Sequence, residues 1–285
     1  MTAAVAETEI SARALEKESR LLEWLARQPS VLVGFSGGVD SAYLACVAHE
    51  AVGADRVLAV IGRSASYPAE QWAAARAVAA KAGLHVLETD THEMDDARYA
   101  ANPSNRCYFC KTELWSVLGH IARERGIATI VDGTNADDLG DWRPGAQAAR
   151  EHGVHSPLAD AGLTKAEIRL LSERRGIPTW SQPSSPCLSS RLPYGTPVTV
   201  ERLSQVERAE RALRAMGITG DLRVRHHGEI ARIELDPALL GEWLQPARLR
   251  AMRDAVLGAG FARGAVDLRG FRSGSLNVLA GVGTA

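Results

Sequence analysis

The sequence predicts an α/β protein with an open, mostly parallel sheet and a second, smaller α/β domain at its C-terminal end. Three observations support this class. Short apolar runs alternate with amphipathic segments of helical length through the first half of the chain. The first apolar run leads into a glycine-rich loop and then a helix, as in sheets that bind ligands at the carboxyl ends of their strands. A proline- and serine-rich segment then precedes a shorter pattern of strands and helices.

The elements of the first half follow from the spacing of apolar residues. Helices are expected where apolar residues recur every three to four positions, and strands where short apolar runs are bounded by turn residues. In chain order we expect a helix at residues 9–28, a strand at 31–35, a helix at 41–51, a strand at 56–61, a helix at 68–82, a strand at 84–88, a helix at 106–124, a strand at 128–133 and a helix at 164–176. Gly176 is expected to end the last helix, because glycine commonly closes helices.

The segment 177–198 contains five prolines and many serines, which is typical of a loop or linker. We therefore expect one domain at residues 1–180, a linker and active-site loop at 181–198, and a smaller substrate-binding and oligomerisation domain at 199–285. The elements expected in that last domain are a helix at 199–216, strands at 221–227 and 230–235, a helical region at 237–258 and a strand at 264–271. Cys187 would then lie between two domains, where small molecules often bind.

The composition of the chain is that of an ordinary globular protein. Of its 285 residues, 46% are hydrophobic and 24% are charged, and the formal net charge is -1. This charge does not call for a nucleic-acid or membrane partner. The N-terminal segment carries acidic residues and no apolar core segment, unlike a signal peptide, and no apolar run in the chain approaches the roughly 20 residues of a membrane helix. We expect a cytoplasmic protein with reduced cysteines.

The strongest local signal is the loop between the first strand and its helix, with the sequence SGGVDS. Its candidate ligand-binding residues are Ser36, Gly37, Gly38, Asp40 and Ser41. The glycines permit close backbone approach, and the helix N-terminus favours an anion. No lysine is present, so this is not the loop that grips β- and γ-phosphates. It resembles instead the SGGxDS loop of the ATP pyrophosphatases, which cleave ATP between the α- and β-phosphates. The simpler interpretation is a Gly-Gly turn.

A second polar loop follows the strand expected at residues 128–133. Asp132, Thr134 and Asp137 lie at the carboxyl end of that strand, with Asn135 and Asp138 between and beside them. Carboxylates beside a triphosphate can hold Mg²⁺, which prefers oxygen ligands. The structural alternative is a polar loop closed by its own side chains.

Three of the four cysteines are candidates for chemistry. Cys46 lies among apolar residues and is expected in the core. Cys107 and Cys110 form a C-x-x-C pair at a helix start, where neighbouring cations favour thiolate, and Cys187 lies in a serine-rich loop. Three thiols suit a four-iron cluster with one open iron. A zinc site completed by His85, His92 or His120, or a buried cysteine pair without metal, are the alternatives.

Several segments together resemble one family. They are the SGGVDS loop, DGTNADDLGDWRPG, SPLADAGLTKAEIR, PCLSSRLPYG, LRVRHHGEIARIEL and DLRGFRSGSLN. In this order, over residues from about 20 to 277, they are similar to the LarE-type ATP-dependent sacrificial sulfur transferases. These belong to the ATP pyrophosphatase (PP-loop) superfamily, so the resemblance implies an adenine-nucleotide α-hydrolase-like fold in the first domain.

The resemblance implies a substrate and a reaction. The substrate would be pyridinium-3,5-biscarboxylic acid mononucleotide, and ATP with Mg²⁺ would activate its carboxylate as an adenylate. Sulfur transfer would then give thiocarboxylate precursors of the nickel-pincer nucleotide cofactor. In one type of the family a loop cysteine, matched here by Cys187, gives up its own sulfur and leaves dehydroalanine. In the other type three cysteines, matched by Cys107, Cys110 and Cys187, resemble a [4Fe-4S] site, and we favour this type.

The resemblance also implies a set of substrate-binding residues and an assembly. The set is Ser190, Arg191, Arg223, Arg225, Glu210 and Glu234. Arginine forks suit carboxylate and phosphate, whereas the two glutamates could equally be surface charges. We expect a small-molecule pyridinium nucleotide as the partner, no nucleic acid, no membrane, and a homo-oligomer. The alternatives are a tRNA thiolase of the same superfamily, and a non-catalytic nucleotide sensor with a zinc site.

Overall fold

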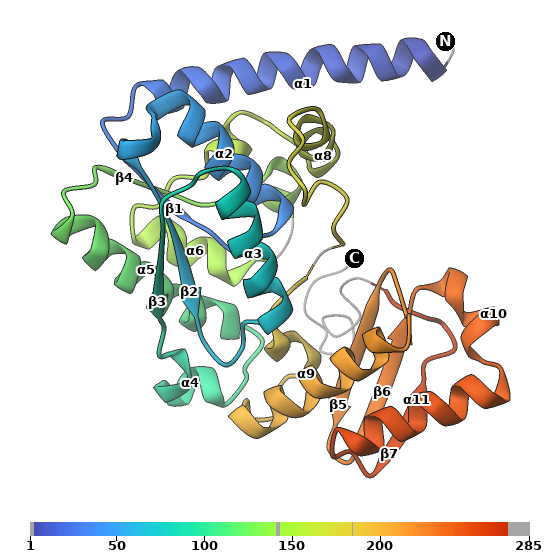
Figure 1. Cartoon of the computed structure of the whole chain (residues 1–285). Helices are drawn as coiled ribbons and strands as arrows, with labels where there is room; N and C mark the ends of the chain where they lie inside the picture. Colours follow the sequence, from blue (N-terminus) through green and yellow to red (C-terminus); the bar gives the residue numbers. More distant parts are fainter. Residues whose placement is uncertain (1–2, 141–142, 184, 273–285) are drawn as a thin grey trace. The chain divides into compact units, whose positions relative to one another are not determined.

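The structure of the chain, a computed structural model, describes residues 3–140, 143–183 and 185–272. The chain divides into two compact units (Figure 1). The first unit comprises Met1–Ser64, Ala69–Glu93 and Cys107–Ser185, and the second comprises Ala65–Pro68, Met94–Arg106 and Pro186–Ala285. The division near residue 185 falls inside the proline-rich segment. Two short insertions from the first half of the chain also belong to the second unit.

The first unit is built on a four-stranded parallel sheet with the strand order β3-β2-β1-β4. The strands are β1 (Val31–Gly34), β2 (Val57–Arg63), β3 (Val86–Asp90) and β4 (Thr129–Val131). In register, Val31 lies opposite Val57 on one side and Thr129 on the other. This arrangement confirms the predicted α/β class. Because β1 is central, the loop that follows it lies in the middle of the carboxyl edge of the sheet.

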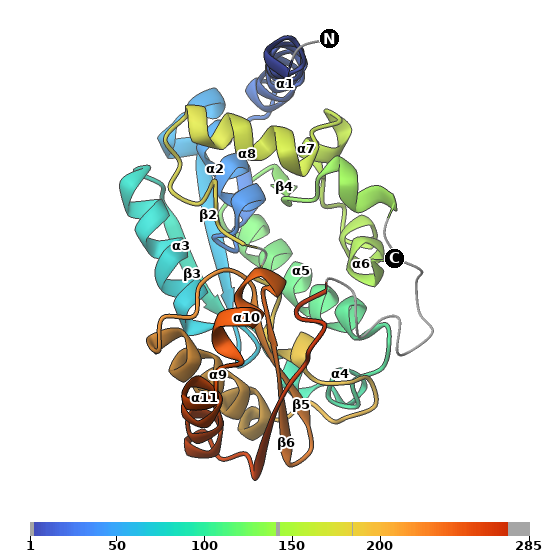
Figure 2. The same ribbon diagram turned by 90° about the vertical axis from the view of Figure 1, so that its right-hand side faces the viewer.

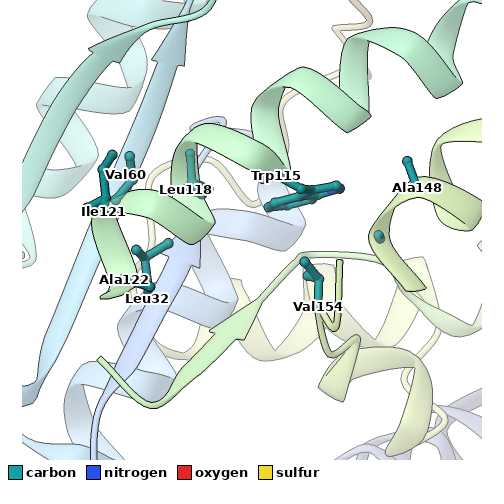
Figure 3. Packing of buried hydrophobic residues seen from close by; sticks show 9 residues of the cluster. Leu32, Val60, Trp115, Leu118, Ile121, Ala122, Ala148 and Val154 are labelled. Carbon is teal, nitrogen blue, oxygen red and sulfur yellow. The ribbon is translucent and has the colours of Figure 1, made fainter. Parts of the chain in front are cut away.

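Helices cover both faces of this sheet (Figure 2). On one face are α1 (Ala3–Ala26), α2 (Val39–Val52), α3 (Ala69–Lys81) and α8 (Lys165–Arg174), and on the other are α5 (Arg106–Glu124) and α6 (Pro144–Glu151). Figure 3 shows the packing of α5, where Trp115 and Leu118 belong to the same buried hydrophobic cluster as Leu32 and Val60. Each such side chain contributes about 1.5–3 kcal/mol when it is fully buried. This packing anchors β1 and thus the start of the glycine-rich loop.

The second unit has its own three-stranded sheet in the order β5-β6-β7. The strands are β5 (Leu222–His227), β6 (Ile230–Leu235) and β7 (Arg263–Val266), with β5 and β6 antiparallel and β7 parallel to β6. The α-helices of this unit that follow the turn at Cys187 are α9 (Val200–Ala215), α10 (Leu240–Trp243) and α11 (Pro246–Gly258). Leu203 and Val206 of α9 are buried, as are Val224 and Ile233 of the sheet.

The structure differs from the sequence-based expectation in several elements. Three short helices were not predicted: α4 (Ala97–Ala100), α6, and α7 (Pro157–Asp160). Helices of four to eight residues contain too few turns to give a clear periodicity. The strand expected at 264–271 ends at Val266, because Asp267 accepts a hydrogen bond from the backbone of Arg269 and starts a turn. The region 237–258 consists of a 3-10 turn at Pro237–Leu239, then α10 and α11; Pro246 begins α11, because proline is tolerated in the first turn of a helix but not in its interior.

Within the described ranges, the structure contains no helix whose length and apolarity would allow it to cross a membrane.

A buried polar network joins three helices of the first unit. The Tyr43 hydroxyl of α2 donates to Glu18 of α1 at 2.8 Å, and Arg175, directly after α8, donates to the same carboxylate at 2.7 Å. Arg175 also pairs with Glu50 at the end of α2. Burial, followed by the hydrogen bond to Glu18, raises the pKa of Tyr43. The network fixes α2 and α8, the two helices whose first residues flank the glycine-rich loop.

Replacement of Arg175 by methionine is expected to lower the free energy of unfolding by about 1–3 kcal/mol, because the buried Glu18 carboxylate loses a charged donor. Urea titration followed by far-UV circular dichroism measures this. The control is Arg27→Met, directly after α1, because the Arg27 pair with Glu23 is exposed on both sides and should contribute less than about 1 kcal/mol. Equal effects of the two substitutions would contradict the structural role of the network.

Candidate functional site

The glycine-rich loop connects β1 to α2 and is closed by two serine hydroxyls. The Ser36 backbone N–H donates to Ser41 Oγ at 3.2 Å, the two hydroxyl oxygens lie 3.1 Å apart, and Ser41 Oγ donates to the Gly38 carbonyl at 3.2 Å. These bonds close the loop over the first turn of α2. The backbone N–H groups at this helix start have no acceptor within the helix itself, which makes the loop suited to an anion.

Gly37 is required here for two reasons. Its φ is +69°, in the left-handed region, and a Cβ built on it would lie 2.3 Å from the Cβ of Ala75 on α3. A side chain at this position would therefore be strained and would also clash. The loop thus passes directly against α3, and Gln71 of that helix donates to the Ser36 carbonyl at 2.9 Å.

Asp132 and Thr134 form a closed loop after β4. Asp132 accepts from the Thr134 backbone at 3.0 Å, from its hydroxyl at 2.9 Å, and from Ser156 at 2.8 Å. This pattern ends β4 at Val131, earlier than expected. Gly133 lies against α2, since a Cβ there would approach the Ser41 nitrogen to 3.0 Å. The Asp132 carboxylate therefore shapes the loop beside the phosphate site.

Lys165 is a charged residue at this site whose role the sequence did not suggest. It is the first residue of α8, after the N-cap Thr164, and its ammonium group forms an ion pair with Asp40. Its backbone N–H donates to Asp137 at 2.8 Å, and Asn135 donates to Asp40 at 3.4 Å. A lysine in the first turn opposes the helix dipole. That unfavourable placement is the signal that sequence reasoning could have used.

Asp138 adds a further carboxylate to this group. It accepts from the Asn135 backbone at 3.1 Å and pairs with Arg143 at 2.6 Å. Burial raises the pKa of Asp138, against the effects of that hydrogen bond and of Arg143. Asp40 and Asp137 are thus brought together with Asp138 and Lys165, whereas Asp132 turns toward Thr134.

In the second unit, Cys187 begins a single 3-10 turn, Leu188–Arg191. Arg191 is buried and donates through Nη1 to the carbonyls of Pro186 and Cys187, at 2.5 and 3.1 Å. Its other two nitrogens form a bidentate pair with Glu210 of α9, both at 2.9 Å. Arg191 therefore holds the peptides on both sides of the Cys187 side chain.

Arg225 and Glu234 form a second buried pair. Arg225 donates to Glu234 at 2.8 Å and to the Ser190 carbonyl at 2.9 Å. Glu234 also accepts from Arg232 at 2.8 Å, so its two oxygens have different arginine partners. The sequence left surface charge as an alternative for the glutamates, but Glu234 is only 1% exposed. Glu210, besides binding Arg191, accepts from the Val224 backbone at 2.9 Å.

Arg223 differs from the other two arginines. It is buried, donates to the Leu222 carbonyl at 2.7 Å, and lies 4.9 Å from the centre of the Phe271 ring. The Asp221 carboxylate is 3.8 Å away. Burial and the positive charge of Arg191 lower the pKa of Arg223 to about 10. An anion bound here would reverse this shift, because it would favour the charged guanidinium.

The four cysteines lie on α2, on α5 and directly before the 3-10 turn Leu188–Arg191. Cys107 and Cys110 are near the start of α5, three residues apart and so on one helix face, with Cys107 exposed and Cys110 partly buried. They belong to the first unit and Cys187 to the second. In the part of the chain that the structure describes, no group of three His, Cys, Asp or Glu residues forms a metal site. Burial raises the pKa of Cys46, on α2.

The chemistry of the thiols can be compared with that of known metal ligands. Three cysteines outside the core, two of them on one helix turn, are soft ligands of the kind that iron–sulfur clusters use. Of the histidines considered for zinc, His120 pairs with Glu124 at 3.1 Å, one turn further along α5.

Comparison with known proteins places these features in context. The sequence profile of the NAD synthase family matches residues 22–125, which include the glycine-rich loop. An uncharacterized protein from Synechocystis sp. is 41% identical over 261 residues, covering 92% of this chain and 97% of that protein. The pyridinium-3,5-bisthiocarboxylic acid mononucleotide synthase from Lactiplantibacillus plantarum is 35% identical over 262 residues, covering 92% of this chain and 94% of that protein.

A more distant match concerns the other function considered. A probable tRNA sulfurtransferase from Methanobrevibacter smithii is 27% identical over 125 residues, which are 43% of this chain and 32% of that protein. The matches to the cyanobacterial and lactobacillar proteins, in contrast, extend over both units. On that near-complete similarity, together with the SGGVDS loop at the end of β1, the chain belongs to the LarE-type family of PP-loop proteins.

Proposed function

We propose that this chain inserts sulfur into pyridinium-3,5-biscarboxylic acid mononucleotide by adenylylating a carboxylate with ATP. Membership of the PP-loop family makes the chain an ATP-using enzyme that is related to sulfur-inserting proteins. Our proposal adds five points to this family assignment: the substrate, the products, the source of the sulfur, a cytoplasmic location and a homo-oligomeric state.

The observation that carries the proposal is the surroundings of Cys187. A cysteine begins a turn whose carbonyls are held by Arg191, and the buried Arg223 and Arg225 belong to the same unit. Arginines suit a substrate with two carboxylates and a phosphate, because their forked donors match these groups. The cysteine suits sulfur chemistry, since a thiolate is a good nucleophile toward an activated carbonyl.

The first step is activation of the substrate. A carboxylate oxygen attacks the α-phosphorus of ATP, the bond from that phosphorus to the bridging oxygen breaks, and pyrophosphate leaves. In this proposal the loop Ser36–Ser41 binds the pyrophosphate through its backbone N–H groups. Asp40 and Asp137 are the carboxylates that would hold Mg²⁺, and Lys165, now paired with Asp40, would turn toward the phosphates.

The second step replaces AMP by sulfur. In the sacrificial version the Cys187 thiolate attacks the carbonyl carbon and AMP leaves. Loss of the Cys187 α-proton then breaks the Cβ–S bond, so that the substrate keeps the sulfur and the protein keeps dehydroalanine. In the version that we favour, Cys107, Cys110 and Cys187 would hold a [4Fe-4S] cluster. When bound, such a cluster leaves one iron without a protein ligand and able to carry sulfide.

A tRNA thiolase is the second candidate, favoured by the local similarity to the probable tRNA sulfurtransferase. The formal net charge of -1 counts against it, because nucleic-acid binding relies on neutralising phosphates with cationic residues. Filter binding of tRNA at low salt distinguishes the two functions. Tight, salt-sensitive binding would support the thiolase.

The central test is turnover with ATP and the pyridinium dicarboxylate, on protein purified anaerobically. We expect pyrophosphate release that depends on both substrates, and formation of a thiocarboxylate. Intact-protein mass spectrometry then identifies the sulfur source. A loss of about 34 Da at Cys187 indicates the sacrificial version, whereas an unchanged mass after several turnovers, with bound iron that is lost in Cys107→Ala, indicates the cluster. Absence of pyrophosphate release would contradict the proposed function.

Replacement of Lys165 by methionine is expected to weaken binding of magnesium-ATP about tenfold or more, since a charged donor to phosphate is lost and Asp40 is left uncompensated. Isothermal titration with a non-hydrolysable ATP analogue measures this. The control is Lys17→Met, which removes an ion pair with Glu167 in the first turn of the same helix α8. Unchanged affinity in Lys165→Met would contradict a role for Lys165 in ATP binding.

Replacement of Arg223 by methionine is expected to abolish stabilisation of the protein by nicotinic acid mononucleotide, a probe with a pyridinium carboxylate and a phosphate. A bound anion would compensate the buried positive charge of Arg223, which lies beside the positive charge of Arg191. Binding should therefore raise the melting temperature of the parent protein. Differential scanning fluorimetry measures the shift. Lys165→Met should retain it, and a shift that is equal in Arg223→Met and the parent would contradict this assignment.

A further inference from the structure

We propose that Asn102 and Arg106 are positioning residues for Cys187. They form a clamp that sets the direction of the Cys187 side chain, and neither belongs to the site that the sequence suggested. The inference rests on the proposed function, because it presumes that the Cys187 thiol is the group whose position matters. All the contacts that carry it lie within the second unit.

The turn that carries Cys187 has few bonds of its own. Within it, the Ser190 N–H donates to the Cys187 carbonyl at 3.0 Å and the Leu192 N–H to the Ser189 carbonyl at 3.1 Å. A single 3-10 turn has poor hydrogen-bond geometry. Leu188 and Ser189 are nonetheless almost completely buried, and Cys187 itself is partly buried. Surrounding groups must therefore hold the turn.

Asn102 holds the chain that follows the turn. Its side-chain amide donates to the carbonyls of Pro193 and Thr196, both at 2.8 Å, and its own carbonyl accepts from the Gly195 N–H at 2.8 Å. Asn102 has no exposed surface. Its φ is +55°, and it is the one non-glycine residue with a positive φ in the described part of the chain. Asparagine adopts this conformation more readily than other residues with a Cβ, and the hydrogen bonds of its side chain and carbonyl hold it there.

Arg106 connects Asn102 to the turn itself. Its Nη1 donates to the Asn102 side-chain oxygen and, at 3.0 Å, to the Ser189 carbonyl. Its guanidinium lies 5.8 Å from the centre of the Tyr194 ring, and only 4% of the residue is exposed. A buried arginine with these partners cannot shift without leaving its charge unmatched.

Two further bonds act on the same residues of the turn. The Tyr99 hydroxyl and the Ser189 hydroxyl lie 2.6 Å apart, and the Leu188 N–H donates to the Ser66 carbonyl at 2.8 Å. Leu188 is therefore hydrogen-bonded to Ser66, and Ser189 is hydrogen-bonded to Tyr99 and Arg106. On the other side, Arg191 holds the carbonyls of Pro186 and Cys187. The backbone of Cys187 is thus fixed from two directions, by two buried guanidiniums.

Such rigidity matters for a reacting thiol. A nucleophile or ligand that is displaced by about 1 Å loses on the order of a hundredfold in rate, because the attack geometry is lost. The clamp should therefore affect the sulfur step and leave adenylylation, which depends on the PP-loop, nearly unchanged. A residue that serves stability alone would affect both steps together.

The experiment compares two half-reactions in Asn102→Gly and Arg106→Lys. Glycine keeps the left-handed backbone but removes the three side-chain bonds, and lysine keeps the charge of Arg106 but loses the fork. We expect pyrophosphate release to stay within about twofold of the parent and thiocarboxylate formation to fall about tenfold or more. The control, Arg208→Ala, removes a guanidinium of the same unit that donates to the Ala259 carbonyl at 3.1 Å, and both rates should stay near those of the parent.

A second readout does not depend on the proposed reaction. In a background with Cys46, Cys107 and Cys110 replaced by serine, the rate of Cys187 alkylation by iodoacetamide reports the setting of its thiol. We expect a change of about threefold or more in Asn102→Gly and Arg106→Lys, and none in Arg208→Ala. Should the parent make no thiocarboxylate, the proposed function fails, but this rate still tests the clamp. Equal loss of both half-reactions, or an alkylation rate equal to that of the parent, would overturn the clamp.

Discussion

The second unit depends on the need to match buried arginine charges. A charge that is removed from water without a partner costs several kcal/mol, so each buried guanidinium determines what must surround it. Arg191 requires Glu210 of α9 and the carbonyls beside Cys187, and Arg225 requires Glu234 of β6 and the Ser190 carbonyl. These pairs bind the helix, the sheet and the 3-10 turn into one block. Apolar packing alone would not specify the turn so closely, since the hydrophobic effect has no direction.

In the first unit, the charges that need partners are negative rather than positive. Its carboxylates at the edge of the sheet, Asp40, Asp137 and Asp138, would repel one another and any phosphate if they were left alone. Lys165 and Arg143 balance them, and Asn135 orders the loop between them through its backbone and its amide. The site that we propose for ATP therefore already contains cations that can offset negative charge. Gly37 and the two serine hydroxyls supply the shape, and these charges supply the balance.

The local parts of this protein could be predicted from the sequence, and the non-local parts could not. The strand, loop and helix around SGGVDS follow from apolar spacing and two glycines, and the resemblance to LarE-type proteins rests on contiguous segments. Lys165 and Asp40, by contrast, are 125 residues apart in the sequence, so no local pattern predicts their ion pair. Asn102 adopts a left-handed conformation that asparagine tolerates, but its hydrogen bonds to Pro193, Gly195 and Thr196 lie about 90 residues along the chain and follow no local pattern. Residues 94–106 read as an ordinary irregular segment between a strand and a helix, and their membership of the second unit appears only in three dimensions.

That membership has a consequence for how the protein is made. The second unit is discontinuous, because residues 65–68 and 94–106 leave the ribosome long before the chain from residue 186 onward that completes it. Ser66, Tyr99, Asn102 and Arg106 must therefore wait during synthesis, with their hydrogen-bonding groups in water, until the cysteine-bearing turn emerges. Contacts of such large sequence separation form late and slowly. The order of translation thus delays the native contacts of the Cys187 turn until Glu210 and Arg225, which follow it in the chain, have also been made.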